Sequence, residues 1–182
     1  AAAVKQAVPA AQASANPEVS FYGDWSERCF PIKSISPCDM LFATVRKDSG
    51  LRITSISIAY VPSNDAFLMQ IAVPLGIDLS KGVIMTAGQY TTAKLVVRRC
   101  DASGCFVETT VGRDVIEGLS QNADQGGHLN VVADGGKAVV FPVSLKGFDA
   151  AYQAMVTNAK EKATGSASTA GQWAKTAQAS HR

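Results

Sequence analysis

The chain has 182 residues, of which 47% are hydrophobic and 18% charged, so it can bury a core and is neither disordered throughout nor fibrous. Its 17 basic and 15 acidic residues give a formal net charge of +2, too small for a nucleic-acid binder that must neutralise phosphates. Residues 157–182 carry a net charge of +3 and residues 21–156 a net charge of −1, so the basic excess lies at the C-terminal end. The sequence has no run of 18 apolar residues, and we expect no transmembrane segment.

Residues 1–20 contain eight alanines and two prolines without a periodic apolar face, and we expect them to form a flexible leader. The chain opens on three alanines and not on Met, which suits a mature product released by a protease that prefers small residues, or a trimmed chain. From residue 21 the pattern changes, and we expect one folded domain over residues 21–160.

This body has short segments rich in β-branched and aromatic residues, separated by turn residues. Strands are expected at residues 21–28, 39–46, 51–60, 66–73, 83–87, 94–100, 105–110, 129–133 and 137–141. Residues 66–73 are almost continuously apolar, as in a strand covered on both faces, which favours a two-layer antiparallel β-sandwich. The serines of residues 51–60, with Thr54, suggest an outer strand. The expected fold class is therefore mainly β.

Two segments have helical patterns. Residues 114–120 predict one or two connecting turns, weakened by Gly118. From Phe148 the apolar residues follow helical spacing, which predicts a helix over residues 146–160 with one buried stripe. The segment 161–182 that follows is small, polar and basic, and we expect it to be disordered when alone.

Four cysteines fall into two short-range pairs, Cys29 with Cys38 and Cys100 with Cys105. An even, locally paired set predicts disulfides formed outside the reducing cytosol. Of the three connectivities that four cysteines allow, we expect these two local pairs, because turn-forming residues lie between Cys100 and Cys105. The spacing does not suit zinc, because C-x8-C and C-x4-C do not supply the tight C-x2-4-C pair on both sides and the two histidines are far from either pair; we expect neither a metal nor another cofactor.

Catalytic motifs for nucleophilic hydrolases, phosphate loops, zinc proteases and dinucleotide binding are missing from the sequence. Of the two histidines, His181 lies next to the end of the chain and His128 follows two glycines, where a solvated loop residue is expected. Paired carboxylates in a sandwich cleft would still permit a glycan hydrolase. Asp24 and Glu27 flank Trp25, but the simpler interpretation of these acids is a strand residue and a surface charge.

The aromatic segment around Trp25 has two interpretations. A tryptophan close to a cysteine in such a strand is normally part of the core. The alternative is an exposed aromatic contact for a sugar or peptide.

Several ordered motifs resemble the invasion-associated locus B family of alphaproteobacteria over residues 21–158. They are Gly23-Asp24-Trp25, then Cys29, Cys38 and Met40, the stretch from Pro74 through Gly76 and Leu79 to Gly82, the Cys100 to Cys105 hairpin, and Ser144-Leu145-Lys146-Gly147-Phe148. The resemblance implies an exported periplasmic or envelope protein, linked in pathogenic members such as Bartonella to entry into erythrocytes. It supplies no catalytic residues, and the four cysteines are the positions that it transfers.

We therefore expect a secreted, disulfide-stapled β-sandwich that is not an enzyme and that binds an unidentified protein or glycan of the envelope or the host surface. An envelope glycan hydrolase is the alternative. A third possibility is that the basic tail, which contains Trp173, folds against an anionic membrane or a partner, although its net charge is low for stable anchoring.

Overall fold

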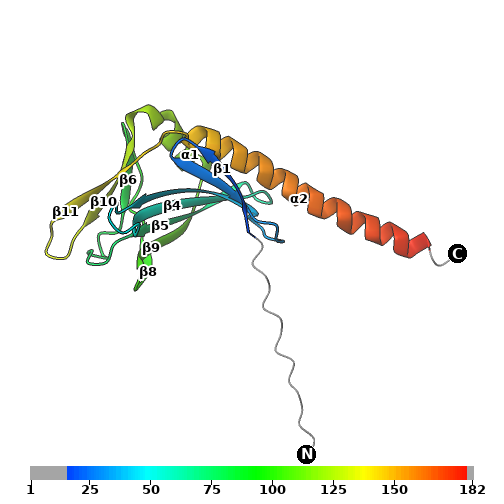
Figure 1. Ribbon diagram of the computed structural model, residues 1–182, viewed down its shortest axis with the longest axis horizontal. Helices are drawn as coiled ribbons and strands as arrows, with labels where there is room; N and C mark the ends of the chain where they lie inside the picture. Colours follow the sequence, from blue (N-terminus) through cyan, green and yellow to red (C-terminus); the bar gives the residue numbers. More distant parts are fainter. Residues whose placement is uncertain (1–15, 180–182) are drawn as a thin grey trace, which may run out of the picture.

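The computed structural model describes residues 16–179, with side chains through residue 164 (Figure 1). The expected leader over residues 1–20 lies mostly outside the described residues, as does His181, but its last three residues belong to the first strand, Glu18–Tyr22, so the folded part begins before residue 21. The described part is mainly β, with two antiparallel sheets and a long C-terminal helix, as the sequence predicts.

The larger sheet has seven strands in the order β1-β2-β3-β4-β5-β9-β8, so five consecutive strands form a meander and the β8–β9 hairpin completes the sheet. Its strands are β1 (Glu18–Tyr22), β2 (Trp25–Cys29), β3 (Cys38–Val45), β4 (Arg52–Val61), β5 (Ala66–Val73), β8 (Val97–Asp101) and β9 (Gly104–Val111).

The smaller sheet has four strands in the order β11-β10-β6-β7. They are β6 (Ile84–Ala87), β7 (Tyr90–Thr91), β10 (Gly127–Val132) and β11 (Ala138–Val143). Helix α1 (Arg113–Gln121) and the one-turn helix η1 (Ala123–Gln125) join β9 to β10, and helix α2 (Phe148–Ala179) follows β11.

The core is one hydrophobic cluster that joins the inward faces of both sheets to α2. On α2 the expected stripe is buried, from Phe148 through Ala151 and Tyr152 to Met155. This half of the helix packs against β1, β2, β3 and β4, whereas Figure 1 shows the rest of α2 running beyond the strands. The seven-stranded sheet therefore has a covered inner face and an open outer face.

Several details of the fold differ from the sequence-based expectation. The segment expected as one strand over 21–28 is a hairpin, because Gly23, with φ +59°, turns the chain between β1 and β2. The segment 51–60 forms β4, the fourth strand of seven and not an outer strand. Its buried Thr54 is satisfied across the sheet, where its hydroxyl lies 2.7 Å from that of Thr44.

The third difference concerns β5, whose outer face is open at Leu68 and Gln70, although Ala72 farther along that face is buried. The fourth is α2, which continues beyond residue 160 to Ala179. Residues 161–164 contain neither Gly nor Pro, the two residue types that disfavour a helix most, so the helix does not end at residue 160. The expected disorder of this segment when alone stays a prediction. The short β7 was not expected.

Candidate functional site

Two motifs that lie far apart in the chain meet where α2 begins. The indole nitrogen of Trp25 donates a hydrogen bond to the carbonyl oxygen of Ser144 at 2.9 Å, and the backbone N–H of Asp24 donates to that of Lys146 at 3.0 Å. The Trp25 ring also meets Phe148 edge to face, with 5.0 Å between centroids. We call this contact between residues 22–25 and residues 144–148 the hairpin–helix clasp.

Glycine is required on both sides of the hairpin–helix clasp. A methyl group on Gly147, whose φ is +85°, would lie 1.9 Å from the carbonyl oxygen of Tyr22. One on Gly23 would lie 2.6 Å from the carbonyl oxygen of Lys146. Trp25 itself is fully buried, which corrects the alternative that its ring is an exposed contact for a sugar or peptide. The clasp therefore has a structural role.

The structure joins Cys29 to Cys38 and Cys100 to Cys105, the two local pairs that the spacing predicts. In each pair the two cysteines lie directly opposite each other on adjacent antiparallel strands. The Cys29–Cys38 bridge is buried and closes the loop 30–37, whereas Cys100 is exposed at the sheet edge. The described residues include no free cysteine.

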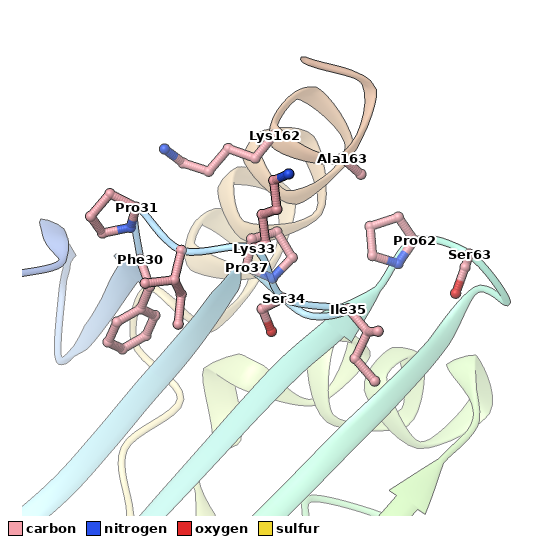
Figure 2. A pocket seen from close by; sticks show the side chains of 11 residues that line it. Phe30, Pro31, Lys33, Ser34, Ile35, Pro37, Pro62, Ser63, Lys162 and Ala163 are labelled. Atoms are coloured by element: carbon pink, nitrogen blue, oxygen red, sulfur yellow. The ribbon is translucent and has the colours of Figure 1, made fainter. Parts of the chain in front are cut away.

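A groove of about 740 Å³ lies at the end of the large sheet, beside the Cys29–Cys38 bridge. The loop 30–37, the turn after β4 and one side of α2 form its walls, as Figure 2 shows. We call it the loop groove, and its lining is Phe30, Pro31, Ile32, Lys33, Ser34, Ile35, Pro37, Pro62, Ser63, Lys162 and Ala163. Most of these side chains are apolar, and the charged ones are two lysines.

The loop groove exposes apolar side chains that the sequence analysis did not single out. Ile32 is 58% exposed and Ile35 71% exposed, although both belong to a loop whose two ends are fixed. The backbone N–H of Phe30 donates to the carbonyl oxygen of Pro37 at 2.9 Å, directly inside the disulfide. The density of apolar residues and prolines between two cysteines was the signal that could have identified this surface.

The opposite wall of the loop groove is the turn between β4 and β5, and Asp65 holds it in place. Its carboxylate accepts hydrogen bonds from the hydroxyl of Tyr60 at 2.8 Å and from the guanidinium of Arg113 at 2.5 Å. These donors, Arg113 first, hold the pKa of Asp65 below its ordinary value. Burial and the neighbouring carboxylate raise the pKa of Tyr60. Arg113 also donates to the hydroxyl of Tyr152, which ties the turn to α2.

A second hollow of about 330 Å³ lies between α2 and the β1–β2 hairpin. We call it the acidic hollow, and its lining is Glu18, Ser20, Glu27, Cys29, Asn158, Glu161 and Lys162. Glu27 is 3% exposed, so it is not the surface charge that the sequence suggested. Its carboxylate accepts a hydrogen bond from the Asn158 side chain at 2.7 Å.

The acidic hollow does not provide a metal site in this disulfide-bonded protein. Glu27, Cys29 and Cys38 form the cluster of possible ligands found among the described residues, with atoms within 4.8 Å of one another. Both sulfurs belong to the disulfide and have no thiolate charge to offer a cation.

The remaining candidates from the sequence are dispersed. His128 lies on strand β10 and not in a loop, with its side chain exposed. Asp24 accepts a hydrogen bond from the Ser144 hydroxyl at 2.5 Å within the clasp. Among the described residues, no histidine lines the loop groove or the acidic hollow. The acids that lie close together are the glutamates of the acidic hollow.

A family model described as invasion associated locus B (IalB) protein matches residues 25–156. The chain belongs to the IalB family. It is also similar in structure to invasion associated protein B from Bartonella henselae, with a TM-score of 0.67 and 22% identity over 79% of this chain and 99% of that chain. At this identity the likeness shows a shared fold. A comparison with curated protein sequences finds no match.

The range matched by the IalB model covers both disulfides and the loop 30–37. It leaves out strand β1, and it ends before Lys162 and Ala163, which line the loop groove. The loop 30–37 and the turn after β4 thus lie within the family match, and the lining residues on α2 lie outside it. The IalB family is not a known enzyme family. Within the described part of the chain, no helix is both long and apolar enough to cross a membrane.

Proposed function

We propose that this IalB-family chain is an exported, non-catalytic envelope protein that binds a partner protein through its loop groove. The observation that carries the proposal is the pair of isoleucines, Ile32 and Ile35, held in the open by a loop that a buried disulfide closes. Contiguous exposed apolar patches with polar residues at their rim mark interaction sites more often than single exposed apolar residues do.

Export is supported by the two disulfides, because such bridges form and persist in oxidising compartments such as the periplasm. The experiment is fractionation of the producing bacterium, followed by alkylation of thiols without reductant. We expect the protein in the periplasmic or envelope fraction with its four cysteines protected. Recovery in the cytoplasm with alkylated cysteines would remove the basis for export.

The chemistry of the loop groove favours an extended apolar peptide segment with an acidic flank. Three prolines and two isoleucines supply apolar contact area, and Lys33 and Lys162 are its charged lining residues. The lining contains no acid, so an acidic flank would meet no like charge. A glycan is less well matched, because Phe30 is the single aromatic ring in the lining.

Binding is tested with the oxidised protein and a synthetic peptide of four apolar residues flanked by glutamates. We expect saturable binding, weakened at least about tenfold by I32S/I35S, which corresponds to about 1.4 kcal/mol. The matched control is L51S/L75S, since Leu51 and Leu75 have similar exposure but do not line the groove. Equal binding by both variants, or equal binding of a peptide with lysine flanks, contradicts the proposal.

We further propose a role in host-cell entry, and membership of the IalB family supports it. In a host-associated bacterium the partner would be a surface protein of the envelope or of the host cell. Deleting the gene should reduce entry, and the wild-type gene should restore it better than I32S/I35S. Normal entry after deletion would contradict this role.

The acidic hollow favours the alternative function, glycan hydrolysis with paired carboxylates. It is lined by Glu18, Glu27 and Glu161, of which Glu27 is buried, and such chemistry uses two carboxyl groups that face each other across a cleft. Release of reducing sugar from envelope glycan by the wild type, abolished by E27Q, would establish this function. Equal release by wild type and E27Q would reject it.

A further inference from the structure

The seven-stranded sheet has two open edges, β1 and β8, and their sequences differ. An open edge offers unpaired backbone N–H and carbonyl groups that can pair with another strand. Proteins usually protect such edges with charged residues, prolines, bulges or very short strands. The two edges can therefore be compared for the protection that each one has.

Strand β8 is protected. It contains Arg98, Arg99 and Asp101, and its pairing with β9 shifts register between Val97 and Arg99. A second copy paired about the centre of this strand would bring one Arg99 guanidinium against the other. The small sheet is protected too, since its edge strand β11 contains Pro142 and its edge strand β7 has only two residues.

Strand β1 is the least protected of these edges. It contains neither a basic residue nor proline, and it pairs with β2 in continuous register over all five residues. Val19 is 46% exposed and Phe21 80% exposed, and alternation along the strand places both on the same face of the sheet. Its single charged residue, Glu18, is paired with Lys162 of α2.

We infer that two copies of this chain associate through β1, pairing edge to edge in antiparallel orientation about a two-fold axis at Ser20. In this register Val19 of one copy lies opposite Phe21 of the other, and Glu18 lies opposite Tyr22. A β-branched residue opposite an aromatic one is a favourable cross-strand pair. All five residues of each β1 strand are then paired.

The neighbouring registers that keep the same face outward are worse. A two-fold axis at Val19 places Phe21 opposite Pro17, which cannot donate a ladder hydrogen bond. A two-fold axis at Phe21 places Val19 opposite Gly23 in the turn and Glu18 opposite Asp24, a like-charge pair. A two-fold axis at Ser20 thus avoids the like-charge pair and keeps the pairing within the five residues of β1.

The resulting dimer has one continuous sheet with both α2 helices on the same face. The antiparallel arrangement places the two loop grooves toward opposite ends of the shared edge, because Cys29 lies opposite Glu18 in each copy. Two grooves in one assembly would make the protein bivalent toward a surface that carries many partner copies. The dimer itself does not depend on what the grooves bind.

A five-residue edge buries little area, so association should be weak and depend on concentration. Sedimentation velocity of the oxidised full chain, from about 5 to about 500 µM, should show a shift from monomer to dimer. The variant V19K/F21K should remain monomeric throughout, because it places lysines on the edge. V140K, which adds a lysine to the edge strand of the small sheet, should dimerise like the wild type.

The register is tested by cysteine cross-linking in non-reducing gels. S20C should form a covalent dimer under mild oxidation, because the two-fold axis brings residue 20 opposite itself. V19C should cross-link much less, since it faces residue 21 of the other copy. A monomer at every concentration, a dimer that persists in V19K/F21K, or stronger cross-linking of V19C than of S20C would overturn the inference.

Discussion

The hairpin–helix clasp buries its apolar side chains, whereas the loop groove leaves its apolar side chains exposed. In the clasp, Trp25 and Phe148 are fully buried, and the indole N–H of Trp25 has a backbone acceptor. In the loop groove, Ile32 and Ile35 are more than half exposed, although their loop is closed by a disulfide and a backbone hydrogen bond. Both regions are covalently or sterically fixed, but only the clasp encloses its apolar side chains.

This difference separates stability from recognition within one fold. The clasp residues carry much of the resemblance to the IalB family, and the structure explains them by packing. The loop groove is lined mostly by residues within the family match, and Lys162 and Ala163 lie beyond it. Substitutions in the clasp should therefore affect folding, and substitutions in the groove should affect binding.

The largest expected effect is that of G147A in the clasp. Its added methyl group would meet the Tyr22 carbonyl at 1.9 Å, so we expect a loss of at least about 3 kcal/mol or failure to fold. The matched control is G135A, with a similar φ of +89° but no atom within 4 Å, which should cost about 1 kcal/mol. Urea unfolding of the oxidised proteins measures both. Equal losses would show that backbone conformation, and not close approach, determines the effect.

The next prediction compares the loss of stability and of peptide binding when each disulfide is removed. Removing either bridge, as C29A/C38A or C100A/C105A, should lower the free energy of unfolding by about 2 to 3 kcal/mol, because each closes a short loop. Only C29A/C38A should also weaken peptide binding, since its bridge fixes one wall of the loop groove. Parallel urea unfolding and peptide titration measure both properties. Equal loss of binding in the two variants would contradict the assignment of the groove.

A smaller effect concerns pH and the Asp65 turn that forms the other wall of the groove. The pKa of Asp65 is lower in the folded protein because Arg113 and Tyr60 donate hydrogen bonds to its carboxylate. Its stabilising contribution is therefore present above the unfolded pKa of about 3.9 and is lost as the pH falls through the lower folded value.

The variant D65N should accordingly show less acid destabilisation than the wild type in urea unfolding below about pH 4. It should also be somewhat less stable near neutral pH, where the charged contact is lost. D134N, in the turn between β10 and β11, serves as the control and should follow the wild-type curve. Identical pH profiles for wild type and D65N would show that this contact does not contribute.

The smallest expected effect on stability is that of I32S/I35S. Because both side chains are mostly exposed, the free energy of unfolding should change by no more than about 0.5 kcal/mol. Urea unfolding checks this value in the same preparation that is used for peptide titration. A loss of several kcal/mol would place these isoleucines in the core and remove the distinction between the two regions.

Local patterns were sufficient for much of the fold. Alternation and turn residues located most strands, the spacing of the cysteines predicted their local pairing, and the stripe from Phe148 to Met155 predicted the buried face of α2. These properties depend on residues close in sequence. Such local properties can therefore be recognised in a single sequence.

Contacts between segments far apart in the chain could not be predicted from the sequence. The position of β4 in the middle of the sheet could not be inferred, because its Thr54 is satisfied by Thr44 of a neighbouring strand. Glu27 looked like a surface charge because its partner, Asn158, lies on α2. The loop groove was missed for the same reason, since its walls come from three segments that only the fold brings together.

The central claim is that the loop groove, and neither the acidic hollow nor the β1 edge, receives the partner segment. Two-dimensional amide NMR of the labelled, oxidised protein, titrated with the peptide of apolar residues and glutamate flanks, tests it most directly. We predict that the shifted resonances cluster at residues 30, 32–36, 63 and 162–163. Shifts centred on Glu27 or on strand β1, or no shifts at saturating peptide, would contradict it.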